Sequence, residues 1–128
     1  MEKIFDQDYI DMLWKQASES PRLRMNYDLR NSVYDTSQRM LNALLPGTEV
    51  PIHRHEETAE TVICLCGKLE EIIYDELPGG TFQEVSRHLL CPAEGRYGMQ
   101  IPKGAWHTIC VIEPSVIFEA KDGAYQPR

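Results

Sequence analysis

The segment "PIHRHEETAE", Pro51–Glu60, carries two histidines separated by one arginine. Side chains two positions apart on a β-strand point to the same face of a sheet. The spacing therefore predicts that His53 and His55 share one face and that Arg54 points to the other. Such a pair is typical of a metal site, but it also occurs at the polar end of an ordinary strand. The segment alone leaves both interpretations open.

Two further residues make the metal interpretation more specific. Glu60 begins "ETVICLC", where strand alternation predicts that it faces inward. His107 follows the turn "PKGAW" and begins a strand face that is otherwise apolar, so its imidazole needs a partner. Three imidazoles and one carboxylate that converge in a barrel suit Zn, Fe, Mn, Ni or Cu. The predicted metal ligands are His53, His55, Glu60 and His107, although a single histidine is more often a solvated or hydrogen-bonded residue.

The four cysteines do not have the spacing of a structural zinc site. Cys64 and Cys66 form C-x-C, whereas C-x-x-C pairs are typical of such sites, and Cys91 and Cys110 stand alone. Alternation places Cys64 and Cys66 on the inward face with Glu60, but a thiolate would duplicate a complete set of four ligands. We therefore interpret these thiols as small buried hydrophobic groups.

The length and charge of the chain limit the classes of protein to which it can belong. Its 128 residues are near the usual size of one domain, and its 42% hydrophobic content is that of a globular protein. The formal net charge of -7 disfavours broad contact with nucleic acid or an anionic membrane. No apolar run approaches the roughly 20 residues of a membrane helix. The N-terminal residues lack a signal peptide, so we expect a cytoplasmic protein with reduced thiols.

Hydrophobic periodicity predicts one helix followed by a β body. Between Asp6 and Ser20, apolar residues recur at three and four positions, with Asp6 as the N-cap and Pro21 as the stop. The rest of the chain shows short runs separated by proline and glycine, which is typical of an antiparallel sandwich or barrel. We expect one all-β domain with a helical arm at residues 1–21 and a β-barrel at residues 22–128.

The spacing of the histidine segment resembles the first motif of the cupin superfamily. The positions of that motif are occupied in order by Gly47, His53, His55, Glu60 and Gly67. The segment "PKGAWH" resembles the core of the second cupin motif, although Val111 replaces its usual asparagine. The resemblance implies a single-domain cupin, a double-stranded β-helix or jelly-roll barrel, with one divalent transition metal per chain: Zn, Fe, Mn or Ni.

A closer resemblance is to the bacterial cupin fold metalloproteins of the WbuC type. It covers nearly the whole chain, including "R-x-R-x-N" from Arg22, "QRML" from Gln38, and an ending similar to "E-x-K-x-G-x-Y-x-P" from Glu119. Asp28 stands where a histidine is expected. The resemblance implies occurrence beside genes for surface polysaccharide synthesis, without an established reaction.

Several residues outside the metal set are predicted to contact a small-molecule ligand. Guanidinium groups suit carboxylates and phosphates, although a solvated strand face explains the arginines equally well. Trp106 walls a pocket or fills core, and a role for Tyr125 as an acid or hydrogen-bond donor rests on the resemblance alone. The predicted substrate-binding residues are Arg22, Arg24, Asn26, Trp106 and Tyr125.

These observations favour a metal-dependent isomerase, epimerase or hydrolase acting on a small polar or sugar-derived substrate. An iron-dependent dioxygenase is the first alternative, because three histidines and a glutamate also suit that chemistry. A non-catalytic, metal-stabilised module that binds or senses a small ligand is the second. We also expect a homodimer, because a helix or a second copy has to cover the apolar outer positions Thr61, Ile63, Leu65, Ile72 and Tyr74.

Overall fold

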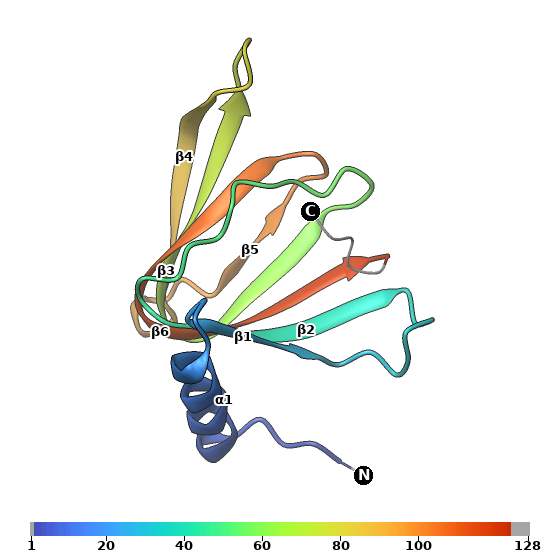
Figure 1. Ribbon diagram of the computed structural model, residues 1–128, viewed down its shortest axis with the longest axis vertical. Helices are drawn as coiled ribbons and strands as arrows, with labels where there is room; N and C mark the ends of the chain where they lie inside the picture. Colours follow the sequence, from blue (N-terminus) through green and yellow to red (C-terminus); the bar gives the residue numbers. More distant parts are fainter. Residues whose placement is uncertain (1, 124–128) are drawn as a thin grey trace.

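A computed structural model describes residues 2–123 and consists mainly of antiparallel strands behind one N-terminal helix (Figure 1). This architecture confirms the predicted all-β fold with a leading helix. Its elements are α1 (Gln7–Glu19), β1 (Arg24–Asp28), β2 (Ser37–Leu44), β3 (Glu60–Glu76), β4 (Phe82–Leu90), the 3-10 helix η1 (Pro92–Glu94), β5 (Gly98–Ile101) and β6 (Trp106–Asp122).

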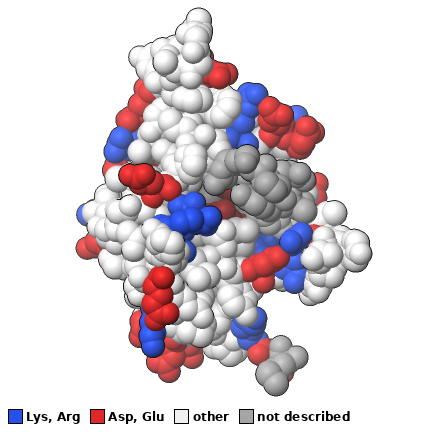
Figure 2. All heavy atoms as spheres, viewed as in Figure 1, with Lys and Arg blue, Asp and Glu red and all other residues white. Residues whose placement is uncertain are grey.

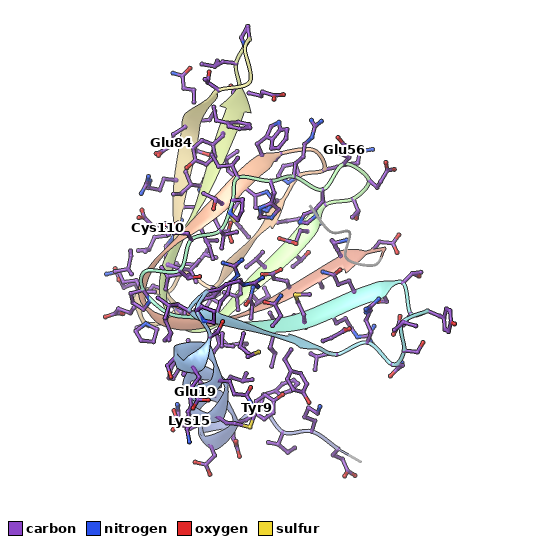
Figure 3. All side chains as sticks on the ribbon, viewed as in Figure 1. Tyr9, Lys15, Glu19, Glu56, Glu84 and Cys110 are labelled. Atoms are coloured by element: carbon purple, nitrogen blue, oxygen red, sulfur yellow. The ribbon has the colours of Figure 1, made fainter. Side chains whose placement is uncertain are left out.

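Helix α1 begins and ends where the sequence predicts. The Asp6 side chain accepts a hydrogen bond of 3.0 Å from the backbone N–H of Tyr9, which caps the first turn. Lys15 and Glu19 lie on the exposed side of the helix (Figure 3). The opposite side buries Ile10, Leu13 and Ala17 in a hydrophobic cluster with Leu41, Ala43 and Val116 of the sheet. The helix therefore covers the part of the sheet around β2 and the end of β6.

The two long strands β3 and β6 run through both layers of the molecule. The sheet order is β1-β2-β6-β3-β4, and β5 pairs with β3. The first half of β3 pairs with the second half of β6, as in Glu60 with Lys121. The second half of β3 pairs with the first half of β6, as in Tyr74 with Trp106. The sheet thus folds over at the middle of both strands, and its two parts diverge from the bend (Figure 1).

The bend differs from the sequence prediction that proline and glycine separate short strands, as they would at Gly67 and at Pro114. Both lie inside continuous strands instead. Gly67 has a φ of +97°, and a Cβ at this position would collide with the Pro114 carbonyl oxygen and Ser115 Oγ. Ser115 Oγ accepts a hydrogen bond of 2.9 Å from the Lys68 N–H. Glycine is needed here because the two bent backbones meet without room for a side chain.

The segment that carries the first two histidines also differs from the prediction, because it is not a sheet strand. His53 forms only an isolated bridge with His107. The Gly104 N–H adds one more hydrogen bond, of 2.8 Å, to the His55 carbonyl oxygen. Pro51 has no N–H to continue a ladder towards the N-terminus. The segment is nevertheless held against the start of β6, which keeps both histidines on the same side.

The register between β3 and β6 shifts repeatedly from Cys64 to Leu69, which interrupts strand alternation there. Cys64 is buried in the core cluster with Val62 and Ile117, as predicted. Cys66 instead packs against the cluster beneath helix α1, because the β3–β6 register shifts between the two cysteines. A β-bulge adds one residue and turns the following side chain to the other face. The prediction that both thiols share one inward face is therefore wrong.

The surface carries mixed charges. Acidic and basic side chains are interspersed on the face seen in Figure 2. Among residues 2–123, no helix has the length and apolar character that a membrane span requires.

Candidate metal centre

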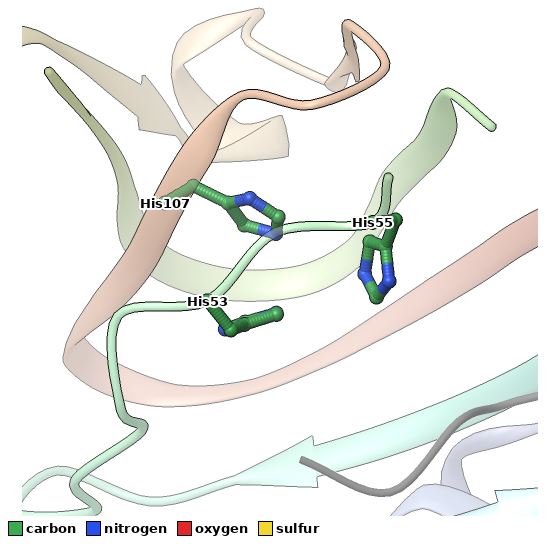
Figure 4. Close-up of side chains that lie close together, drawn as sticks. All are labelled: His53, His55 and His107. Atoms are coloured by element: carbon green, nitrogen blue, oxygen red, sulfur yellow. The ribbon is translucent and has the colours of Figure 1, made fainter. Parts of the chain in front are cut away.

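Three imidazoles gather between the two parts of the folded sheet (Figure 4). His53 and His55 come from the connection between β2 and β3, and His107 is the second residue of β6. One ring nitrogen of each histidine lies within 4.8 Å of the others. The ring centroids of His53 and His107 are 4.3 Å apart, and the other two pairs are 5.3 Å and 5.6 Å apart. The cluster could hold a metal ion.

Glu60 joins this cluster from the first position of β3. Its side chain is almost fully buried, and the residue is only 5% exposed. Glu60 Oε2 lies 3.0 Å from His55 Nε2, and Glu60 Oε1 lies 3.8 Å from His107 Nε2. The structure therefore brings all four predicted ligands together. Burial alone would raise the pKa of Glu60, but His55, His107 and His53 together lower this pKa below its ordinary value.

Backbone carbonyl groups orient two of the rings. His53 Nδ1 lies 2.9 Å from the Pro51 oxygen, and His107 Nδ1 lies 2.9 Å from the Ala105 oxygen. A carbonyl oxygen can only accept, so in each neutral ring the proton sits on Nδ1 and the lone pair on Nε2. The same arrangement fixes ring tautomers in known metal sites.

The contact between His55 and Glu60 also fits a shared cation. His55 Nε2 and Glu60 Oε2 lie 3.0 Å apart. At this distance the two atoms attract each other only if a proton or a metal cation lies between them. Three neutral imidazoles and one carboxylate are a donor set for a divalent transition metal, so these residues fit the predicted cofactor.

The cluster opens into a polar cavity with about 680 Å³ of space, including the part open to solvent. Three predicted ligand-binding residues, Arg22, Arg24 and Asn26, line this cavity from β1 and the segment before it. Arg24 Nη1 also donates to the Glu49 carbonyl oxygen at 2.7 Å, which ties this strand to the connection that carries the histidines. The remaining lining residues are Gln38, Met40, Asn42, Val50, Ile109, Glu71 and Glu119, together with the four candidate metal ligands.

None of these seven further lining residues was predicted from the sequence as a site residue. Gln38 and Asn42 lie on one face of β2, and alternation alone does not say which face of a strand meets a cavity. Glu71 could have been identified from the sequence, because it stands between Leu69 and Ile73 on an otherwise apolar strand face. An acid at such a position is either paired or functional.

The other two predicted substrate residues are not part of the cavity lining that the structure describes. Trp106 points away from its neighbour His107, because adjacent side chains of a strand alternate. Its ring packs 5.0 Å from Phe82, and the Arg54 guanidinium lies 4.5 Å above it. Of the two roles that the sequence left open for Trp106, this packing favours the one in which it fills space between side chains. Tyr125 lies outside the described residues.

Comparison with known proteins identifies both a sequence family and a fold. The family model described as "Domain of unknown function (DUF6016)" matches residues 5–86, which is more than half of the chain. No curated protein matches the sequence.

The solved structures similar to this chain include cupins. Oxalate oxidase in complex with the substrate analogue glycolate has a TM-score of 0.63 at 15% identity, covering 83% of this chain and 54% of its own. KdgF from Halomonas sp. has a TM-score of 0.61 at 14% identity, covering 83% of this chain and 84% of its own. The Cnp3 cupin domain of Schizosaccharomyces pombe has a TM-score of 0.59 at 12% identity, covering 79% of this chain and 61% of its own.

These likenesses confirm the predicted cupin fold. At such low identity they show the fold alone, and the chain spans only about half the length of the oxalate oxidase it matches.

Proposed function

The chain belongs to the family described as a domain of unknown function (DUF6016), and we propose that it is a metal-dependent enzyme acting on a small polar or sugar-derived molecule. One observation carries the proposal: three imidazoles and the buried Glu60 converge at a polar cavity that protein atoms leave open. Pockets of this kind, with a few convergent polar groups, are typical of small-molecule sites.

We propose His53, His55, Glu60 and His107 as ligands of one divalent transition metal per chain. A bound metal of this kind polarises a substrate oxygen or lowers the pKa of bound water. The protein residues around it orient the substrate and shield the reacting atoms from solvent. Arg22 and Arg24 line the same cavity and provide positive charge for a carboxylate or phosphate oxygen.

Kinship with the WbuC-type cupins remains part of the proposal. Two segments that carry the resemblance, "R-x-R-x-N" and "QRML", supply Arg22, Arg24, Asn26, Gln38 and Met40 to the cavity lining. Glu119 from the C-terminal segment lines it as well. Because the similar segments meet at one cavity, the resemblance favours a shared ligand-binding function. A link to surface polysaccharide synthesis would follow from that kinship.

An iron-dependent dioxygenase is the second candidate. The donor set of three imidazoles and one carboxylate suits iron as well as zinc, since imidazole is a ligand for both. Anaerobic purification followed by elemental analysis separates the two candidates. Zinc in the protein and no oxygen consumption on addition of ferrous iron would rule out the dioxygenase.

The proposed function is tested by metal content and by turnover. We expect about one equivalent of metal per chain in protein purified without chelators. Turnover of any active substrate from a panel of sugar phosphates and hydroxy acids is expected to fall at least about tenfold in Glu60→Gln, which keeps the side-chain shape but removes the charge. Ligand-induced stabilisation without turnover would favour a non-catalytic binding module instead.

Homodimerisation also remains a proposal. Helix α1 packs against β1 and β2, and it leaves Ile63 and Leu65 of β3 41% and 40% exposed. A second copy could cover these side chains. Sedimentation analysis at micromolar concentration is the test, and a monomer there would contradict the proposal.

A further inference from the structure

The cavity contains a second group of buried polar side chains besides the candidate metal ligands. Gln38 is 3% exposed and Glu71 is 2% exposed, and both line the cavity together with Asn42. Gln38 Oε1, Asn42 Oδ1 and Glu71 Oε2 are buried oxygen atoms that have no hydrogen-bond partner among the described residues. Because an unsatisfied buried polar atom destabilises a protein, three of them beside one cavity point to a ligand that forms hydrogen bonds with these side chains.

The three oxygen atoms come from opposite parts of the folded sheet. Gln38 and Asn42 are four residues apart on β2, so strand alternation places them on one face. Glu71 lies on the second half of β3 and pairs with Ile109 of β6. The Asn42 amide is oriented by Glu119, whose Oε1 accepts a hydrogen bond of 3.4 Å from Asn42 Nδ2. This bond identifies Oδ1 as the end of the amide available to a ligand.

The charges around the cavity favour an uncharged ligand group at this position. Burial raises the pKa of Glu71 well above its ordinary value, and Glu119 and Glu60 raise it further, which favours the protonated carboxyl. Arg22 and Arg24 oppose a cation in the same cavity, and the carboxyl groups of Glu60 and Glu119, which line the cavity with Glu71, oppose an anion there. Hydroxyl groups meet these conditions, since each donates to an amide oxygen and accepts from a protonated carboxyl.

We propose that Gln38, Asn42 and Glu71 form a subsite for the hydroxyl groups of a polyhydroxylated small molecule. This inference rests on the proposed function, because the subsite and the candidate metal ligands line the same cavity. Gln38 and Asn42 accept hydrogen bonds from the ligand, and Glu71 donates one. The three residues therefore determine specificity for a hydroxyl-rich chain over an apolar chain of the same length.

Calorimetric titration of the zinc-loaded protein with gluconate and hexanoate tests the subsite. Both probes have six carbons and one carboxylate, and only gluconate carries hydroxyl groups along the chain. We expect gluconate to bind at least about tenfold more tightly, which corresponds to about one net hydrogen bond. The near-isosteric variants Gln38→Met, Asn42→Leu and Glu71→Leu should each weaken gluconate binding by about tenfold and leave hexanoate unchanged. Glu71→Gln keeps a hydrogen-bond donor and should retain most of the affinity.

A control variant and measurements of zinc content separate binding at the subsite from chelation by zinc and from loss of structure. Gln83→Leu replaces an exposed amide on β4 and should leave gluconate binding unchanged. Equal binding of the two probes, or no binding of gluconate to zinc-loaded protein, would overturn the subsite. A preference for gluconate that survives all three substitutions would also overturn it, because chelation by zinc alone would then explain the preference. Zinc content and thermal unfolding are measured for every variant. Loss of zinc from the wild-type protein would count against the proposed function, whereas failure of gluconate alone would count only against the subsite.

Discussion

His53 and His107 exchange a pair of backbone hydrogen bonds. The His53 N–H donates to the His107 oxygen at 3.0 Å, and the His107 N–H donates to the His53 oxygen at 2.8 Å. These two candidate ligands are therefore positioned by their main chains, which a side-chain substitution leaves intact. The connection that carries His53 needs no regular strand to hold it in place, because this pair and the hydrogen bond from Gly104 to His55 align it with the start of β6.

His53→Ala is expected to abolish tight metal binding without unfolding the protein. Loss of an outer-shell partner alone typically costs about 10–100-fold in metal affinity, so loss of a ligand should cost more than about a hundredfold. A competition titration with a zinc chelator measures the effect. His88→Ala, which removes the histidine that contacts Ser86 on β4, is the control and should bind zinc like the wild type. Unchanged zinc affinity in His53→Ala would remove His53 from the ligand set.

Arg54→Ala is expected to weaken metal binding slightly by loosening the support behind the ligands. The Arg54 guanidinium lies 4.5 Å above the ring of Trp106, and the two residues adjoin three candidate ligands along the chain. A cation–π contact of this kind contributes about 0.5–1 kcal/mol, so zinc affinity should fall by about two- to fivefold. Glu56→Gln removes the ion pair of Arg54 on the exposed side and should have no effect. Equal zinc affinities for both variants would show that the stacking does not support the site.

Gly67→Ala is expected to destabilise the protein far more than a glycine substitution in the β3–β4 turn. Both Gly67 and Gly79 have positive φ angles, of +97° and +94°, which cost an alanine about 1–2 kcal/mol. Only at Gly67 would the new Cβ collide with the backbone of Pro114, which adds about 1–3 kcal/mol. Urea unfolding of the metal-free proteins measures the difference. A similar loss of unfolding free energy in both variants would mean that the backbone at the bend shifts to accommodate the added methyl group.

Glu71→Gln is expected to reduce the dependence of stability on pH. Burial raises the pKa of Glu71 well above 4.5, with further contributions from Glu119 and Glu60. Between 4.5 and the raised folded-state pKa, the folded protein keeps a proton that the unfolded chain releases. Wild-type stability therefore falls as pH rises through this window, by about 1.4 kcal/mol per pH unit for one proton, and levels off above it.

The variant lacks this titration, so its stability should exceed that of the wild type by an amount that grows with pH. Urea unfolding between about pH 5 and 8 measures both slopes. Glu70→Gln, which removes a neighbouring carboxyl that pairs with Arg87, controls for the loss of a charge. The same dependence of unfolding free energy on pH in the wild type and in Glu71→Gln would contradict the prediction.

The sequence predicted the fold and the four residues that gather in the cluster, because both depend on spacing. His53, His55 and Glu60 stand at fixed intervals before Gly67, whose missing side chain the bend requires. The four ligands meet even though the segment with the first two is not a strand, since an extended backbone places alternate side chains on one side.

The remaining features depend on contacts that spacing does not encode. The bulge between Cys64 and Cys66 arises from pairing with β6, and it separates two thiols that alternation would keep together. Gln38 and Asn42 look like ordinary polar strand residues until the fold places their face against the cavity. The sequence left open whether Trp106 walls a pocket or fills the core, and only the fold shows that its ring packs against Phe82.

Because β3 bends at Gly67, the angle between the two parts of the sheet determines how closely the candidate metal ligands approach one another. Glu60 lies before the bend on β3, whereas His107 belongs to the part beyond it, and their side chains approach to 3.8 Å. A ligand bound by both residues therefore links the two parts of the sheet. A change in the angle between the two parts would move Gln38 and Glu71 relative to each other. The width of the cavity therefore depends on the ligand that the histidines and Glu60 bind.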